Sequence, residues 1–359
     1  MGFDWVRLFH FRNLHDGTID ISAPQVFLRG ENGQGKSNFL ETLYYLSYGG
    51  SFRTRYDQEV CRHGEEEMSL GGSFTSREDR FRIEVRYEEQ RKTICRDGKA
   101  IQDRRDMVSL IPTVLFRHDD MVFVNGSPEK QRWFIDQTLS MNYPLYIDDL
   151  RRYRKILKNR NQLLKDQKYD IIPVYNHHLA EAGLSLQRRR SEVLRSFNDV
   201  FSQEFRYIAD LPEDLTLEYQ ESWTGCETTE AVLACLEKNQ YRERALRTTT
   251  SGPHRDKFLF RYGSRDFLSL ASTGQIRLVS LILRVAQAKF FLKETGRKPL
   301  LLLDDVLLEL DPLRRERFVS RLPPAEQRLF TFLPGNSLQD YRTDETMVYT
   351  IADGRFQRE

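Results

Sequence analysis

The order of apolar and polar residues near the amino terminus predicts a strand, a glycine-rich loop and a helix in succession. The apolar run Val26–Leu28 leads into the loop sequence GENGQGKS at Gly30–Ser37, and Asn38–Tyr48 then shows helical spacing. The apolar residues expected on one face of this helix are Phe39, Leu40, Leu43 and Leu46.

Strand patterns recur in other parts of the chain. Phe81–Tyr87 alternates apolar and charged residues, as a half-buried antiparallel strand does, and Asp97-Gly98 has the composition of a hairpin turn. Strand character returns near Leu215–Tyr219 and Phe258–Tyr262. Strands are therefore expected before and after a middle region whose apolar residues follow a different spacing.

The middle region, from about residue 127 to residue 239, has the pattern of long helices. Pro128 is suited to the first turn of a helix over residues 130–140. Longer, strongly charged helices are expected over Tyr146–Asp166 and Leu179–Tyr207.

A last helix and a buried strand are expected after the middle region. The helix covers Gln275–Thr295 and should end at Gly296. Pro299–Asp305 follows as an apolar strand of the kind found in parallel sheets. We therefore expect an α/β lobe formed by residues 1–126 and 241–359, with a mostly helical lobe inserted at residues 127–240.

Composition is that of a water-soluble globular protein with about two domains. The 359 residues are 39% hydrophobic and 30% charged, and the net charge of +2 by itself gives no indication of nucleic-acid binding. No apolar run is long enough to span a membrane, and the amino terminus lacks the features of a secretion signal. The four cysteines show no metal-binding spacing. We therefore expect a cytoplasmic protein.

The glycine-rich loop has the G-x-x-x-x-G-K-S pattern of a phosphate-binding loop. Its glycines let backbone N–H groups converge on phosphate oxygens, Lys36 reaches the β- and γ-phosphates, and the Ser37 hydroxyl is suited to bind Mg²⁺. A plain glycine turn is the alternative, but it leaves the flanking strand and helix unexplained. The residues expected to bind the nucleotide are Gly30, Glu31, Asn32, Gly33, Gln34, Gly35, Lys36, Ser37 and Asn38.

Two carboxylates end the apolar strand near the other end of the chain. Asp304 would hold Mg²⁺, directly or through water, and Asp305 would act as a general base toward the attacking water. A merely solvated strand end is the alternative. The expected catalytic residues are therefore Asp305 and Lys36, and the expected metal ligands are Ser37 and Asp304.

The segment Ala271–Gln275 opens the helix that precedes the acidic strand. Its hydroxyls and N–H groups could form an anion site, although serine or threonine with glycine at a helix start is more often only a cap. Its place between loop and acidic strand is similar to the order of motifs in ABC-type ATPases. That resemblance implies that Ser272, Gly274 and Gln275 contact ATP held by a second copy, which would make an ATP-dependent homodimer.

Further motifs resemble those of the RecF family of recombination ATPases, which are related to SMC and Rad50 proteins. Phe11-Arg12-Asn13 is similar to its FRN element and Gly252–Asp256 to its GPHRD segment. Helical motifs at residues 153–164 and Leu179–Gly183, and the block Pro299–Asp311, are also similar. The resemblance implies an α/β, ABC-type P-loop ATPase head with an inserted, mostly helical second lobe and no long coiled coil.

The resemblance also implies a role in recombinational DNA repair. The chain would bind ATP and Mg²⁺, dimerise on DNA at gaps and single-strand/double-strand junctions, and act as a slow, DNA-stimulated ATPase switch. With RecR and RecO it would support RecA loading, replication restart and SOS induction. Two alternatives stay open: an ATP-gated DNA clamp or scaffold with negligible hydrolysis, and a transporter-type ATP-binding subunit, against which the FRN and GPHRD elements argue.

Several positions depart from the family pattern. Arg117–Asp120 reads RHDD where the family usually has SPED, Leu308 replaces a common serine, and Lys257 a frequent aspartate. Phe332 stands where many ABC-type ATPases carry a polar or histidine γ-phosphate sensor. Since phenylalanine cannot hydrogen-bond to phosphate, we expect slower hydrolysis, with binding less affected.

Basic residues concentrate in the segment 151–168, which carries eight lysines and arginines, and again at residues 188–190. On a helix, several of them share one face and could neutralise DNA phosphates without reading sequence. A solvated helix face is an equally good interpretation, and Arg53 and Arg55 are weaker candidates. The residues expected to contact DNA are Arg151, Lys155, Lys158, Arg188 and Arg189.

His254 and Arg255 belong to the GPHRD segment. A His-Arg-Asp sequence can indicate catalysis, but the surrounding kinase pattern is missing here. We favour a structural or site-supporting role for these residues.

Overall fold

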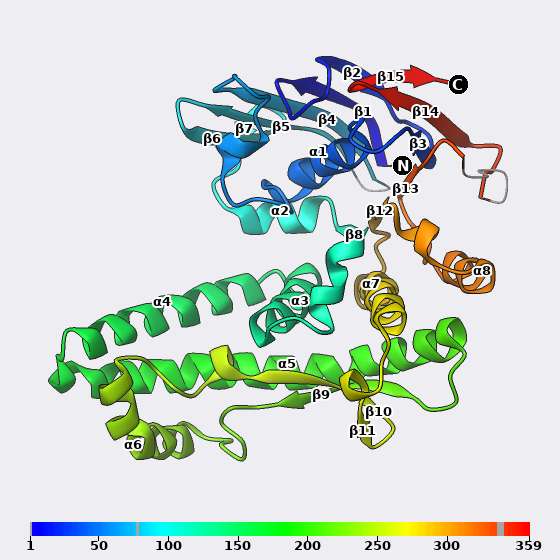
Figure 1. Cartoon of the computed structure of the whole chain (residues 1–359). Coiled ribbons are helices and arrows are strands. Elements are labelled where there is room, and N and C mark those ends of the chain that lie inside the picture. The colour runs from blue at the N-terminus through cyan, green and yellow to red at the C-terminus, as the bar shows by residue number, and fades with distance from the viewer. Residues whose placement is uncertain (1, 77–78, 336–340) are drawn as a thin grey trace. The chain divides into compact units, whose positions relative to one another are not determined.

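The computed structural model describes residues 2–76, 79–335 and 341–359, and it divides into two compact units. The first comprises Met1–His118 and Phe291–Glu359, so it is built from both ends of the chain, and the second comprises Asp119–Phe290 (Figure 1). The second unit therefore extends further in both directions than the lobe expected at residues 127–240.

The first unit contains a six-stranded, mostly parallel sheet in the order β15-β14-β3-β13-β12-β8. Its strands are β3 (Gln25–Arg29), β8 (Thr113–Arg117), β12 (Leu300–Asp304), β13 (Gln327–Phe332), β14 (Thr346–Ala352) and β15 (Arg355–Arg358). Neighbouring strands from β14 to β8 run parallel, whereas β15 is antiparallel to β14. Each residue of Leu300–Leu303 is at most 1% exposed, which confirms the buried strand expected there.

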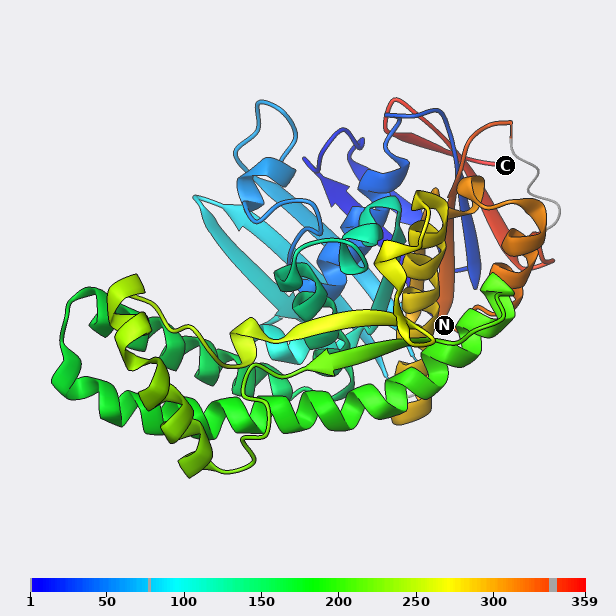
Figure 2. The same ribbon diagram turned by 60° about the horizontal axis from the view of Figure 1, so that its bottom comes forward.

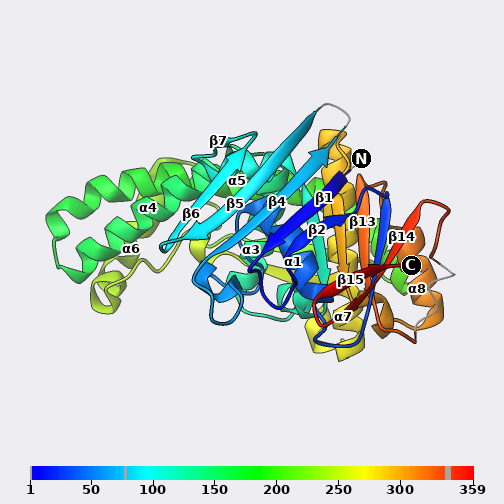
Figure 3. The same cartoon turned by 90° about the horizontal axis from the view of Figure 1, so that it is seen from above.

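A second sheet of this unit is antiparallel, in the order β2-β1-β4-β5-β6-β7 (Figure 3). Its strands are β1 (Gly2–Phe9), β2 (Gly17–Asp20), β4 (Met68–Thr75), β5 (Arg80–Glu88), β6 (Arg91–Arg96) and β7 (Lys99–Ala100). Buried and exposed residues alternate along all of β5, as the sequence predicted. Asp97 and Gly98 have φ angles of 49° and 77° in the turn between β6 and β7, which confirms the hairpin.

Helix α1 (Lys36–Tyr48) contacts strands of both sheets. Phe39, Leu40 and Leu43 of its predicted apolar face are fully buried in one hydrophobic core with side chains from both sheets. Two shorter helices of this unit are α2 (Arg104–Leu110) and α8 (Pro312–Ser320). Because one core holds α1, the loop before it is fixed against the ends of the parallel strands.

The second unit is built around α5 (Ile172–Ala209), a helix of 38 residues (Figure 2). Its other helices are α3 (Pro128–Asn142), α4 (Tyr146–Lys165), α6 (Thr229–Leu246) and most of α7 (Thr273–Thr295). Helix α5 begins before the expected Leu179 because Pro173 occupies its first turn, where a proline costs no hydrogen bond. Gly296, with φ of 68°, ends α7 as predicted. No described helix is long and apolar enough to cross a membrane, and no long coiled coil occurs among them.

A three-stranded antiparallel sheet, in the order β11-β10-β9, packs on α5. Its strands are β9 (Leu215–Gln220), β10 (Lys257–Tyr262) and β11 (Arg265–Asp266). The ring of Phe260 in β10 lies 6.3 Å from that of Phe201 in α5, and the ring of Phe290 in α7 lies 5.7 Å from that of Phe197. Through these contacts the residues after position 240 join the helical unit, which explains its extension to Phe290.

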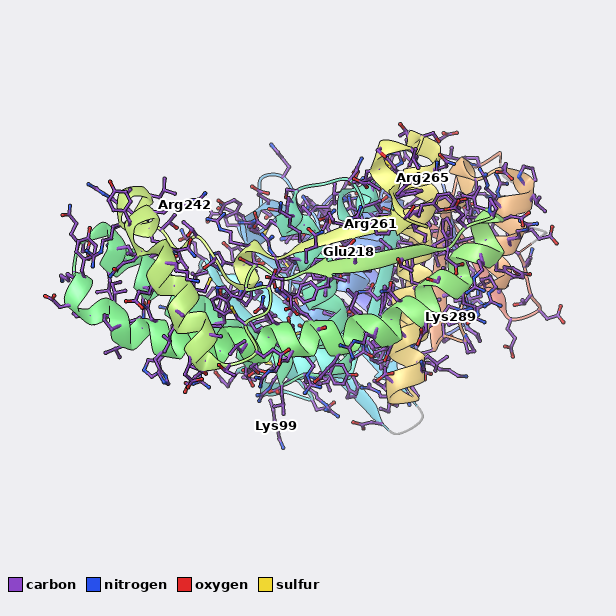
Figure 4. The ribbon with its side chains drawn as sticks, turned by 90° about the horizontal axis from the view of Figure 1, so that it is seen from below. Lys99, Glu218, Arg242, Arg261, Arg265 and Lys289 are labelled. Atoms are coloured by element: carbon purple, nitrogen blue, oxygen red, sulfur yellow. The ribbon has the colours of Figure 1, made fainter. Side chains whose placement is uncertain are left out.

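The other face of this sheet is polar. Arg261 of β10 forms an ion pair with Glu218 of β9 (Figure 4). Arg265 of β11 lies 3.6 Å from Glu213. Exposed pairs of this kind contribute little to stability. The sheet is therefore held mainly by its apolar contact with α5.

Candidate nucleotide site

The loop between β3 and α1 requires glycine for steric reasons. A Cβ atom on Gly30 would stand 2.4 Å from the carbonyl oxygen of Ile351, and one on Gly35 would stand 2.7 Å from the Leu14 side chain. Gly35 also has a φ of 114°, which disfavours other residues. Strand β14 and the segment after β1 thus pack closely against the loop. Without side chains at the glycines, the backbone N–H groups of the loop are accessible to a phosphate.

Lys36 and the start of α1 provide the positive potential of the site. Lys36 is 4% exposed, and its ammonium group donates hydrogen bonds to the carbonyl oxygens of Gly30 at 2.8 Å and Glu31 at 3.1 Å. No side chain among the described residues caps the first turn of α1. Its N–H groups and the positive end of its dipole therefore suit an anion.

Ser37 and Asp304 bring the loop and the acidic strand together. The Ser37 hydroxyl donates a hydrogen bond to Oδ1 of Asp304 at 2.6 Å. Burial raises the pKa of Asp304, and so does Asp305, whereas the Ser37 hydrogen bond and the positive charges of Arg53 and Arg117 lower it. The two oxygens form a pair of hard ligands of the kind that Mg²⁺ prefers.

Asp305 is held beside this pair by Thr331, which the sequence analysis did not single out. Its N–H donates to Thr331 Oγ1 at 2.7 Å, and that hydroxyl donates to Asp305 Oδ1 at 2.8 Å. Asp305 has a φ of 53°, so the chain turns sharply where β12 ends. The only indication of Thr331 in the sequence was a single threonine within the strand QRLFTF.

Phe332 faces the other side of β13 from Thr331, because side chains alternate along a strand. It is 1% exposed, and its ring lies 5.0 Å from Phe27 and 6.0 Å from Phe330. Phe332 therefore packs in the sheet's aromatic core, and Thr331 is the residue of β13 at the acidic pair. The side chain of Leu308, the other departure noted near the acidic strand, lies outside the described part.

The FRN element, Phe11-Arg12-Asn13, follows β1 and holds the loop in place. Arg12 donates from Nε and Nη2 to the fully buried carboxylate of Glu41 in α1, at 3.0 and 2.9 Å. Asn13 donates to the carbonyl oxygen of Gly33 at 2.9 Å and accepts from the Asn38 side chain at 2.7 Å. These contacts fix the loop to the first turns of α1.

The Ser-x-Gly-Gln segment lies in the second unit, at the start of α7. Ser272 and Gly274 are exposed and Gln275 is half-buried. The Ser272 N–H donates to Gln275 Oε1 at 2.8 Å, and the Gln275 N–H donates to Ser272 Oγ at 3.3 Å. These two hydrogen bonds form a capping box, which is the helix-cap alternative considered for this segment from the sequence.

The basic residues expected to contact DNA are exposed on two helices. Lys155 and Lys158 are exposed on α4, as is Arg151, which lies 3.5 Å from Asp148. On α5, Arg188 is exposed and donates to the Glu227 carbonyl oxygen, and the exposed Arg189 lies 3.7 Å from Glu192.

Two other arginines of the same clusters are not available to DNA. Arg160 is 1% exposed and pairs with the buried Glu243 at 2.6 Å. Arg190 is 3% exposed and pairs with Asp136 at 2.9 Å and Asp256 at 3.0 Å. Both fall within the basic segments 151–168 and 188–190, but each satisfies a buried carboxylate from a distant segment.

The described contacts of His254 and Asp256, in the GPHRD segment, connect parts of the second unit. The Tyr153 hydroxyl lies 2.7 Å from His254 Nδ1, and His254 Nε2 lies 3.2 Å from the Thr249 carbonyl oxygen. Burial lowers the pKa of His254 to about 4, so the ring is neutral at pH 7. Asp256 is fully buried beside Arg190. These contacts tie α4, α5 and β10 together, in keeping with the structural role that we favoured.

Comparisons with known proteins identify the family of the chain. The family model described as the RecF/RecN/SMC N terminal domain matches residues 4–333. The chain is 40% identical over 351 residues to the DNA replication and repair protein RecF of Treponema pallidum (strain Nichols), covering 96% of this chain and 98% of that protein. It is 33% identical over 348 residues to RecF of Desulfitobacterium hafniense (strain Y51), covering 94% and 95%.

Solved structures show the same relationship. The fold is similar to that of the recombination mediator protein RecF bound to ATP, in the RecFOR pathway, with a TM-score of 0.91 and 28% identity over 100% of this chain and 97% of that one. An Smc head bound to the C-winged helix domain of ScpA has a TM-score of 0.58 at 14% identity and 97% coverage of that chain, which supports the ABC-type head fold alone. From the match over nearly the whole length, the chain belongs to the RecF family.

Proposed function

We propose that this protein binds ATP together with Mg²⁺ at the phosphate loop. The contact between Ser37 and Asp304 carries the proposal, because it puts oxygens of two distant motifs at one point beside Lys36. Ser37 and Asp304 would hold the magnesium ion, whose positive charge would offset the negative charge of the phosphates. ATP bound to the similar RecF structure supports the choice of nucleotide.

Hydrolysis in this proposal depends on Asp305 and Lys36. Thr331 holds one carboxylate oxygen of Asp305, which leaves the other to accept a proton from water. Lys36 would stabilise the negative charge that develops on the transferred phosphate. We propose slow, DNA-stimulated hydrolysis that serves as a switch.

Dimerisation is proposed from the segment at the start of α7. Ser272 and Gly274 are exposed at a helix N-terminus, a position suited to a phosphate oxygen. In the proposed dimer, Ser272, Gly274 and Gln275 of one copy approach ATP bound to the loop of the other. ATP binding would then bring two copies together, and hydrolysis would release them.

DNA binding is proposed for the exposed basic residues of α4 and α5, through the phosphate backbone. Membership of the RecF family supports a role in DNA repair and replication. The RecFOR pathway named for the similar RecF structure supports RecO and RecR as partners, with RecA acting downstream. We propose that the ATP-bound dimer recognises gaps and single-strand/double-strand junctions and so supports RecA loading, replication restart and SOS induction.

DNA binding measured with ATP, with ADP and without nucleotide tests this proposal. We expect tight binding to a gapped duplex only with ATP, together with a doubling of mass in light scattering that a Ser272→Arg variant lacks. Equal DNA affinity in all three conditions, or a Ser272→Arg variant that still dimerises, would contradict it. A protein that dimerises on DNA but releases no more phosphate than an Asp305→Asn variant would instead be an ATP-gated clamp.

A further inference from the structure

Arg117 ends β8 directly beside the acidic strand. In the parallel pairing of β8 with β12, Arg117 is the partner of Asp304, just as Phe116 is the partner of Leu303. The Arg117 side chain is half-buried. Its backbone thus occupies the same edge of the sheet as the proposed magnesium ligand, one strand away.

The Arg117 guanidinium is stacked on an aromatic ring rather than extended into solvent. It lies 4.6 Å from the ring centroid of Phe52, and the guanidinium of Arg53 lies 5.4 Å from the same ring. Phe52 is held in turn by Tyr44 of α1, with ring centroids 5.3 Å apart at an angle of 88°. A guanidinium held against a fixed ring loses less freedom on binding a ligand.

The stack reaches the first turn of α1 through Arg53. Arg53 donates from Nη1 to the side-chain oxygen of Asn38, the residue after Ser37. Arg53 thus reaches the residue after Ser37, and Arg117 is paired in register with Asp304. Both guanidiniums lie on one ring beside the position that Ser37 and Asp304 define.

The order of strands fixes the side of the site on which Arg117 lies. Along the sheet, β3 with its loop is followed by β13, β12 and β8. Arg117 is thus separated from the loop by Thr331 and Asp304, on the side away from the glycines that would hold the inner phosphates. If the glycines hold the inner phosphates, the terminal phosphate of a triphosphate would be the one on the side of Asp304 and Arg117.

We propose that Arg117 is a cationic contact for the terminal phosphate of a bound nucleoside triphosphate and makes the site discriminate ATP from ADP. The proposal rests on the nucleotide site described above and adds a residue to it. A guanidinium pairs strongly with phosphate oxygens, whereas lysine offers only a point charge at the same place. ADP lacks the phosphate that Arg117 would contact.

Titration of the full chain with a fluorescent ADP and a fluorescent, non-hydrolysable ATP analogue, both with Mg²⁺, tests the proposal. We expect Arg117→Ala to weaken binding of the ATP analogue about tenfold or more and to leave that of ADP within about twofold. Arg117→Lys should keep part of the preference. Arg86→Ala is the matched control, since Arg86 is an exposed arginine of β5 in the same unit, 3.6 Å from Glu84.

Two results would overturn the proposal. Equal losses for both nucleotides in Arg117→Ala would show that Arg117 only supports the fold of the site, and unchanged affinity for both would remove it from the site. Should the alanine variant not fold, Arg117→Gln decides the matter by the same criteria, because glutamine keeps a long polar side chain without the charge. A wild-type chain that binds neither nucleotide would contradict the proposed function itself, which is a separate outcome.

Discussion

The Ser37 hydroxyl and the Asp304 carboxylate form a hydrogen bond of 2.6 Å although 267 positions separate them in sequence. Both residues belong to the first unit, which the two ends of the chain build together. The candidate nucleotide site is therefore formed by one segment that precedes the second unit in the sequence and one that follows it.

Replacing either partner of this hydrogen bond should reduce the magnesium dependence of nucleotide binding. We expect Ser37→Ala and Asp304→Asn to weaken ATP binding about tenfold or more with Mg²⁺ and to change it little with a chelator, because the hard oxygen ligands are removed. Nucleotide titrations in both conditions measure this. Ser47→Ala, which removes another hydroxyl of α1, is the control. Equal losses with and without Mg²⁺ would argue against a metal at this point.

The two kinds of basic residue on α4 should differ in their effect on stability. Arg160→Ala removes the partner of the buried Glu243 and two further hydrogen bonds, so it should lower the free energy of unfolding by about 3–5 kcal/mol. Lys158→Ala, on the exposed side of the same helix, should change it by no more than about 0.5 kcal/mol. Urea unfolding followed by circular dichroism measures both. Similar values for the two variants would mean that the Arg160 pair contributes little.

His254 should make stability depend on pH below neutrality. Its pKa is about 4 in the folded protein and 6.5 in the reference state, so between these values the unfolded chain binds more protons. The stability contributed by the neutral ring is thus present above pH 6.5 and is lost as pH falls toward 4. From pH 7 to pH 5 we expect a loss of about 2 kcal/mol that His254→Gln largely lacks. Urea unfolding at the two pH values provides the test, and an unchanged pH dependence in the variant would refute it.

The exposed basic residues should affect DNA binding through charge alone. Replacing Arg151, Lys155 and Lys158 by alanine should weaken binding to all sequences and flatten the slope of affinity against salt concentration, by about 0.9 for each DNA phosphate that is no longer neutralised. Fluorescence anisotropy at several salt concentrations measures the slope. A matched triple variant on the first unit, such as Arg82, Arg86 and Arg91 to alanine, controls for net charge. An unchanged slope would remove the α4 residues from the DNA site.

The sequence was sufficient to predict the strand, loop and helix of the candidate nucleotide site, because glycine spacing and apolar periodicity both constrain that segment strongly. It also predicted that Ser37 and Asp304 would converge, since both would serve one metal ion. Thr331 was missed because a single threonine in an apolar strand carries no motif. Its importance appears only when β13 pairs with β12 and sets Thr331 beside Asp305.

Local sequence patterns could not predict where the helical unit begins and ends, or which of its arginines are buried. Charge runs on a helix do not show which arginine turns inward, since the partners of Arg160 and Arg190 include Glu243 and Asp256 from distant segments. The extension of the unit to Phe290 likewise depends on packing of β10 and α7 against α5. Long-range packing of this kind leaves no periodic signal in the sequence.

Single-turnover ATP hydrolysis by the wild-type protein and by Asp305→Asn, with DNA present, tests the nucleotide site most directly. Asparagine keeps the size of the side chain but cannot accept a proton, so the variant should bind ATP as tightly and release phosphate at least about 100-fold more slowly. Equal rates of phosphate release from the two proteins, or loss of ATP binding in the variant, would contradict the role assigned to Asp305.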